Sequence, residues 1–204
     1  MKGPLDVEIW FDLICPWCLI GKRQLEEALA RYRALHPQRP VRVHWRSQQL
    51  LPDVPPQGLP FREFYLARLG SAEAVAARQA QVREAGARAG LDFDFDGIPV
   101  MPNTRAAHAL VSDAADQAEP AAVDALIEDL FAAHFQRGEN LADDALLEAI
   151  AERHGVRRQG VEAEAAPAVS GVPLFLVNRA VALGGAQPPE QLLALLKDAD
   201  RVAC

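Results

Sequence analysis

Cysteine, methionine and aromatic residues are scarce in this chain of 204 residues, which has 3 Cys, 2 Met, 3 Trp, 2 Tyr and 8 Phe. No apolar run approaches the ~20 residues that a membrane-spanning helix needs. Lysine and arginine (21) are fewer than aspartate and glutamate (28), so the net charge is −7. Without a positive excess, the chain is a poor partner for nucleic acid or an anionic membrane surface. These absences leave a globular protein, and its half-apolar composition is sufficient for a packed core.

The N-terminal stretch lacks the features of a secretory signal. Lys2 is followed by Asp6, Glu8 and Asp12, with no uncharged apolar segment and no small-residue cleavage site. We therefore expect a cytoplasmic protein. For its oligomeric state, we expect either a monomer or a homodimer.

Two of the three cysteines stand together in Cys15-Pro16-Trp17-Cys18. An alternating apolar pattern over 5–14 predicts a strand before this motif, and helical spacing over 18–35 predicts a helix after it. Alternation returns over 41–45, so the pattern predicts a βαβ unit with parallel strands. A CxxC motif in this setting indicates a redox dithiol.

The predicted start of the helix gives each residue of the motif a position. Cys15 is expected at the N-cap, Pro16 at the first helical position and Cys18 at the third. Pro16 then loses nothing by lacking an N–H group, and its φ suits the first turn. The free N–H groups and the positive end of the helix dipole both favour a thiolate on Cys15, which is the nucleophilic form.

The rest of the chain divides by composition. Residues 50–60 are rich in proline, and the pattern is then helical over the segments 61–69, 71–90, 104–117, 120–136 and 143–154. Strands are expected over 173–177 and 181–183, with a turn at Asn178-Arg179 and a terminal helix from Pro188. This order predicts an α/β, thioredoxin-like fold (βαβ…ββα) with an inserted all-helical domain. We expect residues 1–58 and 168–204 to form the discontinuous thioredoxin-like domain and residues 59–167 to form the insertion.

Seven motifs stand out along the chain: Ile9-Trp10-Phe11-Asp12, the CPWC motif, Gly21-Lys22-Arg23, Trp45-Arg46-Ser47, Pro102-Asn103-Thr104 with Ala107-His108, Gly171-Val172-Pro173 and Gly185-Ala186-Gln187-Pro188-Pro189-Glu190. Together they resemble the DsbA-like thioredoxin family, specifically its FrnE-type branch, which is related to 2-hydroxychromene-2-carboxylate isomerases and kappa-class glutathione transferases. The resemblance covers nearly the whole chain.

The resemblance implies roles for the dithiol and for a segment expected beside it. Cys15 would be the attacking thiol and Cys18 the resolving thiol. Pro173 would be cis and pack against the dithiol, and the Val172 backbone would pair with an extended substrate segment. Pro16 and Trp17, between the two cysteines, would also contact the substrate.

Three further residues are candidates for substrate or glutathione binding. Asn103 and His108 stand at the start of a predicted helix, where a plain capping role is the alternative. Gln187 precedes another helix N-terminus, which is suited to a carboxylate, although Gly-Gly and Pro-Pro beside it also make an ordinary turn and helix start.

Trp17 predicts a milder redox couple than that of DsbA, because the DsbA motif has a histidine between its cysteines that can carry positive charge. We expect a potential of roughly −200 to −270 mV, between thioredoxin and glutaredoxin. No tightly bound cofactor or metal is implied. Glutathione, or a thioredoxin-type donor, would supply electrons, and the substrate would be a protein or small molecule that contains a disulfide.

We therefore expect a cytosolic thiol–disulfide oxidoreductase or isomerase that uses the CPWC dithiol. Two other functions use the same motifs. A glutathione-dependent isomerase or transferase is the first alternative, although such relatives resemble proteins with serine at the first active position, and this chain keeps both cysteines. The second alternative is a redox-sensing, chaperone-like binding protein.

Metal sites are disfavoured. Zinc needs four ligands, which the histidine spacing does not supply. Asp92 to Gly97 match only the first half of a calcium loop, where Asn103 replaces the required glutamate. The connection over 155–170 is shorter than in the family, which affects the expected substrate groove. Cys204 is expected to be a solvated thiol at the chain end.

Overall fold

The computed structural model describes residues 3–160 and 169–202. The chain divides into two compact units, Met1–Gln48 with Ala165–Cys204 and Gln49–Glu164. None of the helices in the described parts of the chain is long and apolar enough to span a bilayer.

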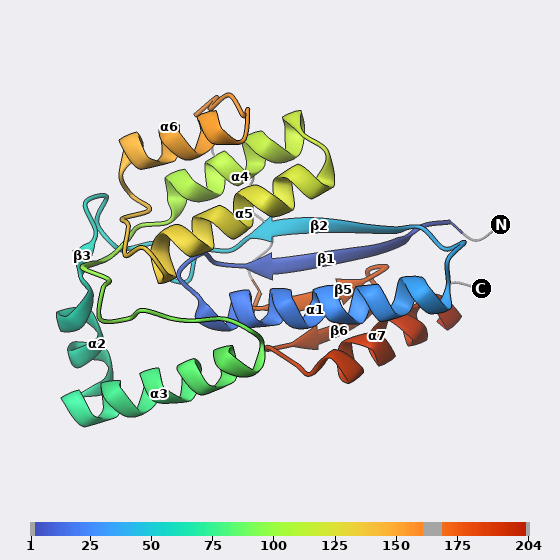
Figure 1. Cartoon of the computed structure of the whole chain (residues 1–204), viewed down its shortest axis with the longest axis horizontal. Helices are drawn as coiled ribbons and strands as arrows, with labels where there is room; N and C mark the ends of the chain where they lie inside the picture. Colours follow the sequence, from blue (N-terminus) through green and yellow to red (C-terminus); the bar gives the residue numbers. More distant parts are fainter. Residues whose placement is uncertain (1–2, 161–168, 203–204) are drawn as a thin grey trace. The chain divides into compact units, whose positions relative to one another are not determined.

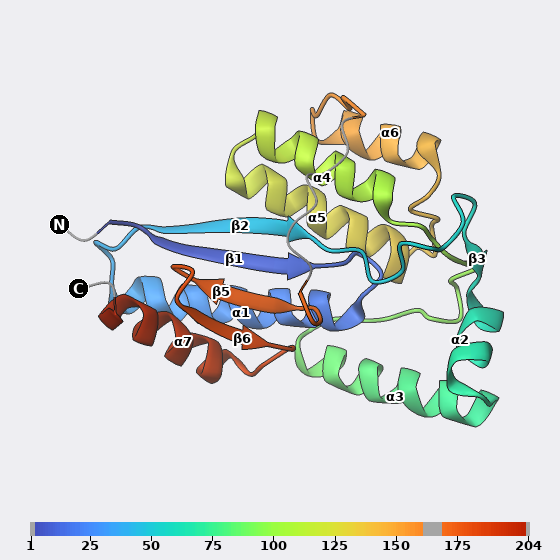
Figure 2. The same ribbon diagram turned by 180° about the vertical axis from the view of Figure 1, so that it is seen from behind.

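The first unit contains a four-stranded sheet of β1 (Leu5–Phe11), β2 (Val41–Ser47), β5 (Leu174–Val177) and β6 (Val181–Gly184). The strands lie in the order β2-β1-β5-β6 (Figure 2). β1 and β2 are parallel and in register from Leu5–Val41 to Phe11–Ser47, which confirms the predicted βαβ unit. β5 is antiparallel to both β1 and β6, so the sheet is mixed.

Helices α1 (Pro16–Leu35) and α7 (Pro189–Val202) pack together on one face of this sheet (Figure 1). Alternation in β1 sends Leu5, Val7 and Ile9 to that face, where they are almost fully buried. They pack against the apolar side chains of α1 and the leucines of α7. The strand period of 2 and the helix period of 3.6 thus place their apolar residues in one shared core. This arrangement is a thioredoxin-like α/β fold.

The turn between β5 and β6 places both Asn178 (φ 51°) and Arg179 (φ 54°) in the left-handed region. Such a two-residue hairpin turn matches the right-handed twist of the flanking strands. Asn178 tolerates this geometry, and its side-chain Oδ1 accepts a hydrogen bond from the Asp6 N–H at 3.0 Å, which ties the turn to β1.

The second unit is mainly helical, as predicted. Its helices are α2 (Phe61–Leu69), α3 (Ala72–Arg88), α4 (Arg105–Gln117), α5 (Pro120–Phe135) and α6 (Asp144–Arg153). α4, α5 and α6 pack against one another, and α2 and α3 meet at a sharp corner (Figure 1). The sequence analysis did not predict the two-residue ladder between β3 (Leu59–Pro60) and β4 (Val100–Met101). Pairs this short show no periodicity, and proline ordinarily argues against a strand.

The segment that resembles half a calcium loop is a hydrophobic anchor. Phe93 and Phe95 are buried and stacked with centroids 5.5 Å apart, and both meet Phe135 edge-on. The Asp94 carboxylate accepts the Gly97 N–H, and Asp96 pairs with Arg83. Asp94 and Asp96 therefore stabilise the loop through these contacts. No metal-binding cluster of His, Cys, Asp and Glu occurs among the described residues.

The division between the units follows Gln48, earlier than the boundary at residue 58 expected from the proline-rich stretch. The proline-rich stretch makes its hydrogen bonds to the second unit. The Val54 carbonyl accepts a hydrogen bond from the Asn103 side-chain amide at 2.6 Å, and β3 pairs with β4. The other expected boundary, between residues 167 and 168, lies outside the described residues.

Candidate active site

The dithiol lies at the junction of β1 and α1. Cys15 is the N-cap of α1 with extended backbone angles (φ −94°, ψ 106°), and Pro16 occupies the first helical turn, as predicted. The Cys18 N–H donates to the Cys15 carbonyl at 3.0 Å, and the Cys15 N–H donates to the Asp12 carbonyl at 3.1 Å. These bonds hold the two cysteines one helical turn apart with their sulfurs facing the same side.

Both thiols are reduced and buried, Cys15 at 5% exposure and Cys18 at 2%. Burial is the main cause that raises the pKa of the Cys18 thiol well above its ordinary value. Its hydrogen bond to the Cys15 sulfur and the negative charges of Cys15 and Asp12 act in the same direction, against the opposing hydrogen bond from the Asp12 backbone. Cys18 therefore remains a thiol at neutral pH, which suits the sulfur that reacts second.

A second segment of the first unit reaches the dithiol from the other half of the chain. The Cys15 thiol lies 3.9 Å from the Val172 carbonyl oxygen, as a weak sulfur hydrogen bond. The Val172–Pro173 peptide bond is cis, in agreement with the implication of the resemblance. The sheet thus brings together residues 157 positions apart in sequence, because β5 begins at Leu174 and pairs directly with β1.

Asp12 is a residue of this site that the sequence analysis missed. Its side chain is fully buried, and its carboxylate is close enough to Cys18 to raise the pKa of that thiol. The sequence shows an acid three residues before Cys15, directly after β1, but its burial and its effect on Cys18 appear only in the folded structure. Pro16 and Trp17 are half-buried beside the two cysteines.

Asn103 and His108 belong to the second unit, and their role toward substrate stays a prediction. The Asn103 Oδ1 accepts from the Arg105 N–H at 3.0 Å and from the Gln49 side chain at 3.1 Å, so this residue caps α4 and anchors a loop. His108 is 2% exposed within α4. Gln187 lies in the first unit, where its amide donates to the Gly184 carbonyl at 2.8 Å and closes the turn before α7. Cys204 lies outside the described residues.

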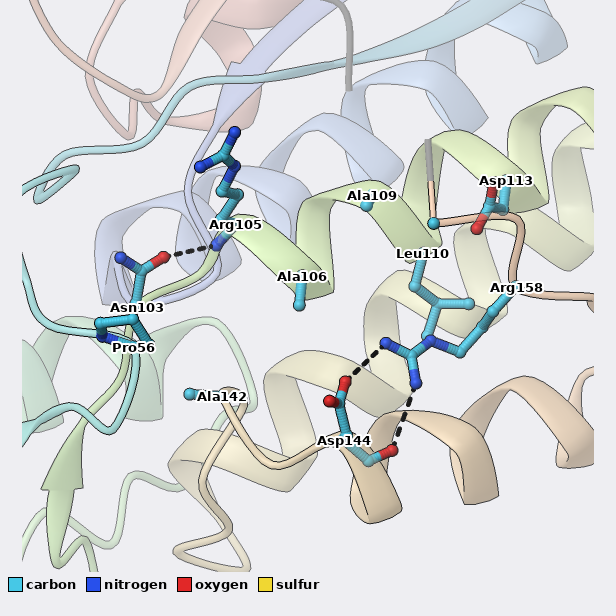
Figure 3. Close-up of a pocket in the computed structure, with 11 residues that line it drawn as sticks. Pro56, Asn103, Arg105, Ala106, Ala109, Leu110, Asp113, Ala142, Asp144 and Arg158 are labelled. Carbon is cyan, nitrogen blue, oxygen red and sulfur yellow. Dashed lines mark hydrogen bonds and ion pairs between the residues drawn. The ribbon is translucent and has the colours of Figure 1, made fainter. Parts of the chain in front are cut away.

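A cavity of about 400 Å³ lies within the second unit (Figure 3). Its apolar lining comes from α4, Pro56 and Ala142, and its charged side chains are of both signs. Arg158 faces Asp144 at 2.9 Å, and the Asp113 carboxylate accepts the Gln159 N–H at 2.9 Å. Two arginines and two aspartates line the cavity, so its lining carries no net charge that would select an ionic ligand.

Comparison with known proteins places this site in a family. A model of the DsbA-like thioredoxin domain matches residues 6–167. The chain belongs to the DsbA-like thioredoxin family. No match was found among curated proteins.

Solved structures share the fold of this DsbA-like chain. A probable DsbA oxidoreductase from Streptomyces coelicolor is 26% identical with a TM-score of 0.84, over 97% of this chain and 90% of the other. The cytosolic disulfide reductase DsbM from Pseudomonas aeruginosa, solved with GSH, is 18% identical with a TM-score of 0.55, over 96% and 99%. A 2-hydroxychromene-2-carboxylate isomerase is 13% identical with a TM-score of 0.57, over 97% and 95%. The last two likenesses concern the fold alone.

Proposed function

We propose that this DsbA-like protein is a cytosolic thiol–disulfide oxidoreductase whose two working groups are Cys15 and Cys18. The observation that carries the proposal is the environment of the two sulfurs. Cys15 is the N-cap of α1 and its sulfur lies 3.9 Å from the Val172 carbonyl oxygen, whereas Cys18 lies inside the helix, where burial raises the pKa of its thiol. This difference gives the two sulfurs an order of reaction.

In the first step, the Cys15 thiolate attacks one sulfur of a substrate disulfide. A Cys15–substrate S–S bond forms, the substrate S–S bond breaks, and the second substrate sulfur leaves as a thiolate that takes up a proton. The Val172 carbonyl, 3.9 Å from the Cys15 sulfur, offers a backbone acceptor to an extended substrate segment at this point.

In the second step, Cys18 loses its proton and attacks the Cys15 sulfur. The substrate leaves with its second thiol, and Cys15–Cys18 becomes a disulfide, so two electrons pass to the substrate. Two glutathione molecules or a thioredoxin-type dithiol then return two electrons and are oxidised to a disulfide. The structure of DsbM with GSH, a protein of the same fold, supports glutathione as the donor.

The test compares two variants in a Cys204→Ser background, so that only the dithiol can react. Cys18→Ser should trap a mixed disulfide with native insulin, whose disulfides Cys15 can attack, because the first step proceeds and the second cannot. Cys15→Ser should trap none. Equal trapping by both variants would assign attack to either sulfur and contradict the proposed order. The parent protein should reduce insulin with glutathione as the electron source.

The glutathione-dependent isomerase alternative makes a different prediction, which equilibration in glutathione buffers tests. In that case glutathione supplies the thiol, and Cys15 and Cys18 would show no reversible loss of two electrons in glutathione buffers. A redox-sensing chaperone would keep its anti-aggregation activity in Cys15→Ser and would not reduce insulin.

A further inference from the structure

Gly21 stands in the interior of α1, one helical turn after Cys18, and is buried. Its backbone is helical, so the position does not need the left-handed conformation for which glycine is usually used. Glycine is also the weakest helix former after proline. The local structure of α1 therefore gives no reason for a glycine here.

The reason lies in what packs against the helix. A Cβ atom at residue 21 would lie 3.1 Å from Pro173 Cγ and 3.1 Å from Phe175 Cζ, closer than ordinary van der Waals contact. Both neighbours are buried. α1 and the start of β5 thus approach so closely that a Cβ at residue 21 would require a neighbour to shift by a few tenths of an ångström.

The two neighbours differ in how far they can move. Phe175 is fully buried in the core between the sheet, α1 and α7, and its strand is paired on both sides. Pro173 precedes β5, and the residue before it, Val172, is only half-buried. An added methyl group would therefore displace the Val172–Pro173 segment in preference to the strand.

That segment carries the carbonyl oxygen 3.9 Å from the Cys15 sulfur. We propose that Gly21 is a positioning residue for the proposed reaction: its missing side chain lets the Val172–Pro173 segment sit against α1 at the height that aligns a substrate backbone with Cys15. The inference rests on the proposed oxidoreductase function, and it concerns substrate alignment, since the atoms nearest to an added Cβ at residue 21 belong to Pro173 and Phe175.

The test is Gly21→Ala, with insulin as the disulfide substrate and glutathione as the donor. We expect KM to rise about tenfold with a smaller change in kcat, because sub-ångström misplacement of a substrate segment weakens alignment. Alkylation of Cys15 by iodoacetamide, which needs no substrate segment, should change less than about twofold. A merely structural role would leave KM unchanged or move both readouts together with stability.

Gly184→Ala is the matched control, because a Cβ there meets nothing within 4 Å. It should retain the parent KM. Gly21→Ala/Phe175→Leu addresses the case in which Gly21→Ala folds poorly, because removing Cζ relieves one of the two close contacts. Phe175 is fully buried, so its truncation itself costs stability, and Phe175→Leu alone is the reference for the double variant. Relative to that reference, KM should stay raised through Pro173.

The outcomes separate the two proposals. An active parent protein with a Gly21→Ala KM within twofold of the parent would overturn the role of Gly21 alone, and so would a normal KM in the double variant. An inactive parent and inactive Gly184→Ala would overturn the oxidoreductase function and this inference with it.

Discussion

Cys15 and Cys18 are separated by one helical turn, yet their environments assign them different chemistry. One sulfur sits at the helix N-cap, and the other is buried beside Asp12. The cap position could be predicted from sequence because it depends on neighbouring residues only: a strand, a CPWC motif and a helix. Asp12 could not be assigned, because its effect depends on the depth at which β1 ends beneath the dithiol.

At the scale of single residues, Trp17 allows a prediction about the redox potential of the Cys15–Cys18 couple. Replacing it with histidine puts an ionisable ring between the cysteines, which stabilises the thiolate and hence the reduced form. The parent couple should lie at roughly −200 to −270 mV, and Trp17→His should raise the potential by about 30 mV or more, which corresponds to about tenfold in the equilibrium constant. Equilibration in glutathione buffers, with alkylation and mass readout, measures both values. Trp17→Phe is the matched control and should stay near the parent. A parent potential above about −150 mV would contradict the expectation.

At the scale of elements, strong helical periods predicted α2 to α6 with ends that differ from the structure by at most two residues. The hairpin at Asn178-Arg179 was also predictable, because asparagine favours left-handed geometry. That Arg179 adopts it too follows from strand pairing, which sequence does not display. The ladder between β3 and β4 depends wholly on a long-range encounter.

The end of α5 depends on another such encounter. Gly138 (φ 63°) packs so closely on the loop before β4 that a Cβ would collide with the Gly97 carbonyl oxygen. Gly155 (φ 65°) has similar backbone geometry, but a Cβ there meets nothing within 4 Å. Gly155→Ala should therefore cost only the left-handed strain, about 1–2 kcal/mol. Gly138→Ala should cost about 1–3 kcal/mol more through overpacking.

Urea unfolding of both variants measures the difference in the free energy of unfolding. Equal losses would mean that the Gly97 segment yields without cost and that the contact does not fix the loop.

At the scale of the whole molecule, each unit contains a carboxylate that accepts hydrogen bonds from two arginines. Glu8 in the first unit accepts from Arg179 at 2.8 Å and Arg46 at 3.1 Å. Asp129 in the second accepts from Arg137 at 2.8 Å, Arg153 at 2.9 Å and His154 at 3.2 Å. The amino-acid composition predicts only a net negative charge. The partners of Glu8 and Asp129 could not be predicted from it, because folding of the sheet and of the helices brings them together.

The two carboxylates predict how stability depends on pH. Burial acts to raise the pKa of Glu8 and of Asp129, but hydrogen bonds from the cations outweigh it and lower both. A carboxyl group whose pKa is lowered by folding stabilises the native state above its unfolded pKa of about 4, and this stabilisation is lost as pH falls through the lower folded value. Glu8→Gln and Asp129→Asn should each reduce the free energy of unfolding by about 1–2 kcal/mol at pH 7. The difference from the parent should shrink between about pH 4 and pH 3, where the parent carboxyls take up protons.

Urea unfolding from pH 7 to pH 3 tests this, with Glu190→Gln as the control. Glu190 is also paired with an arginine, at 3.0 Å, but its side chain is 68% exposed. Solvent screens such a pair, so its loss should change stability little at any pH. If all three variants lose the same stability, and lose it equally at pH 7 and pH 3, then packing rather than charge holds Glu8 and Asp129 in place. A selective loss that fades with acid would show that each unit depends on the charge of its own arginine-bound carboxylate.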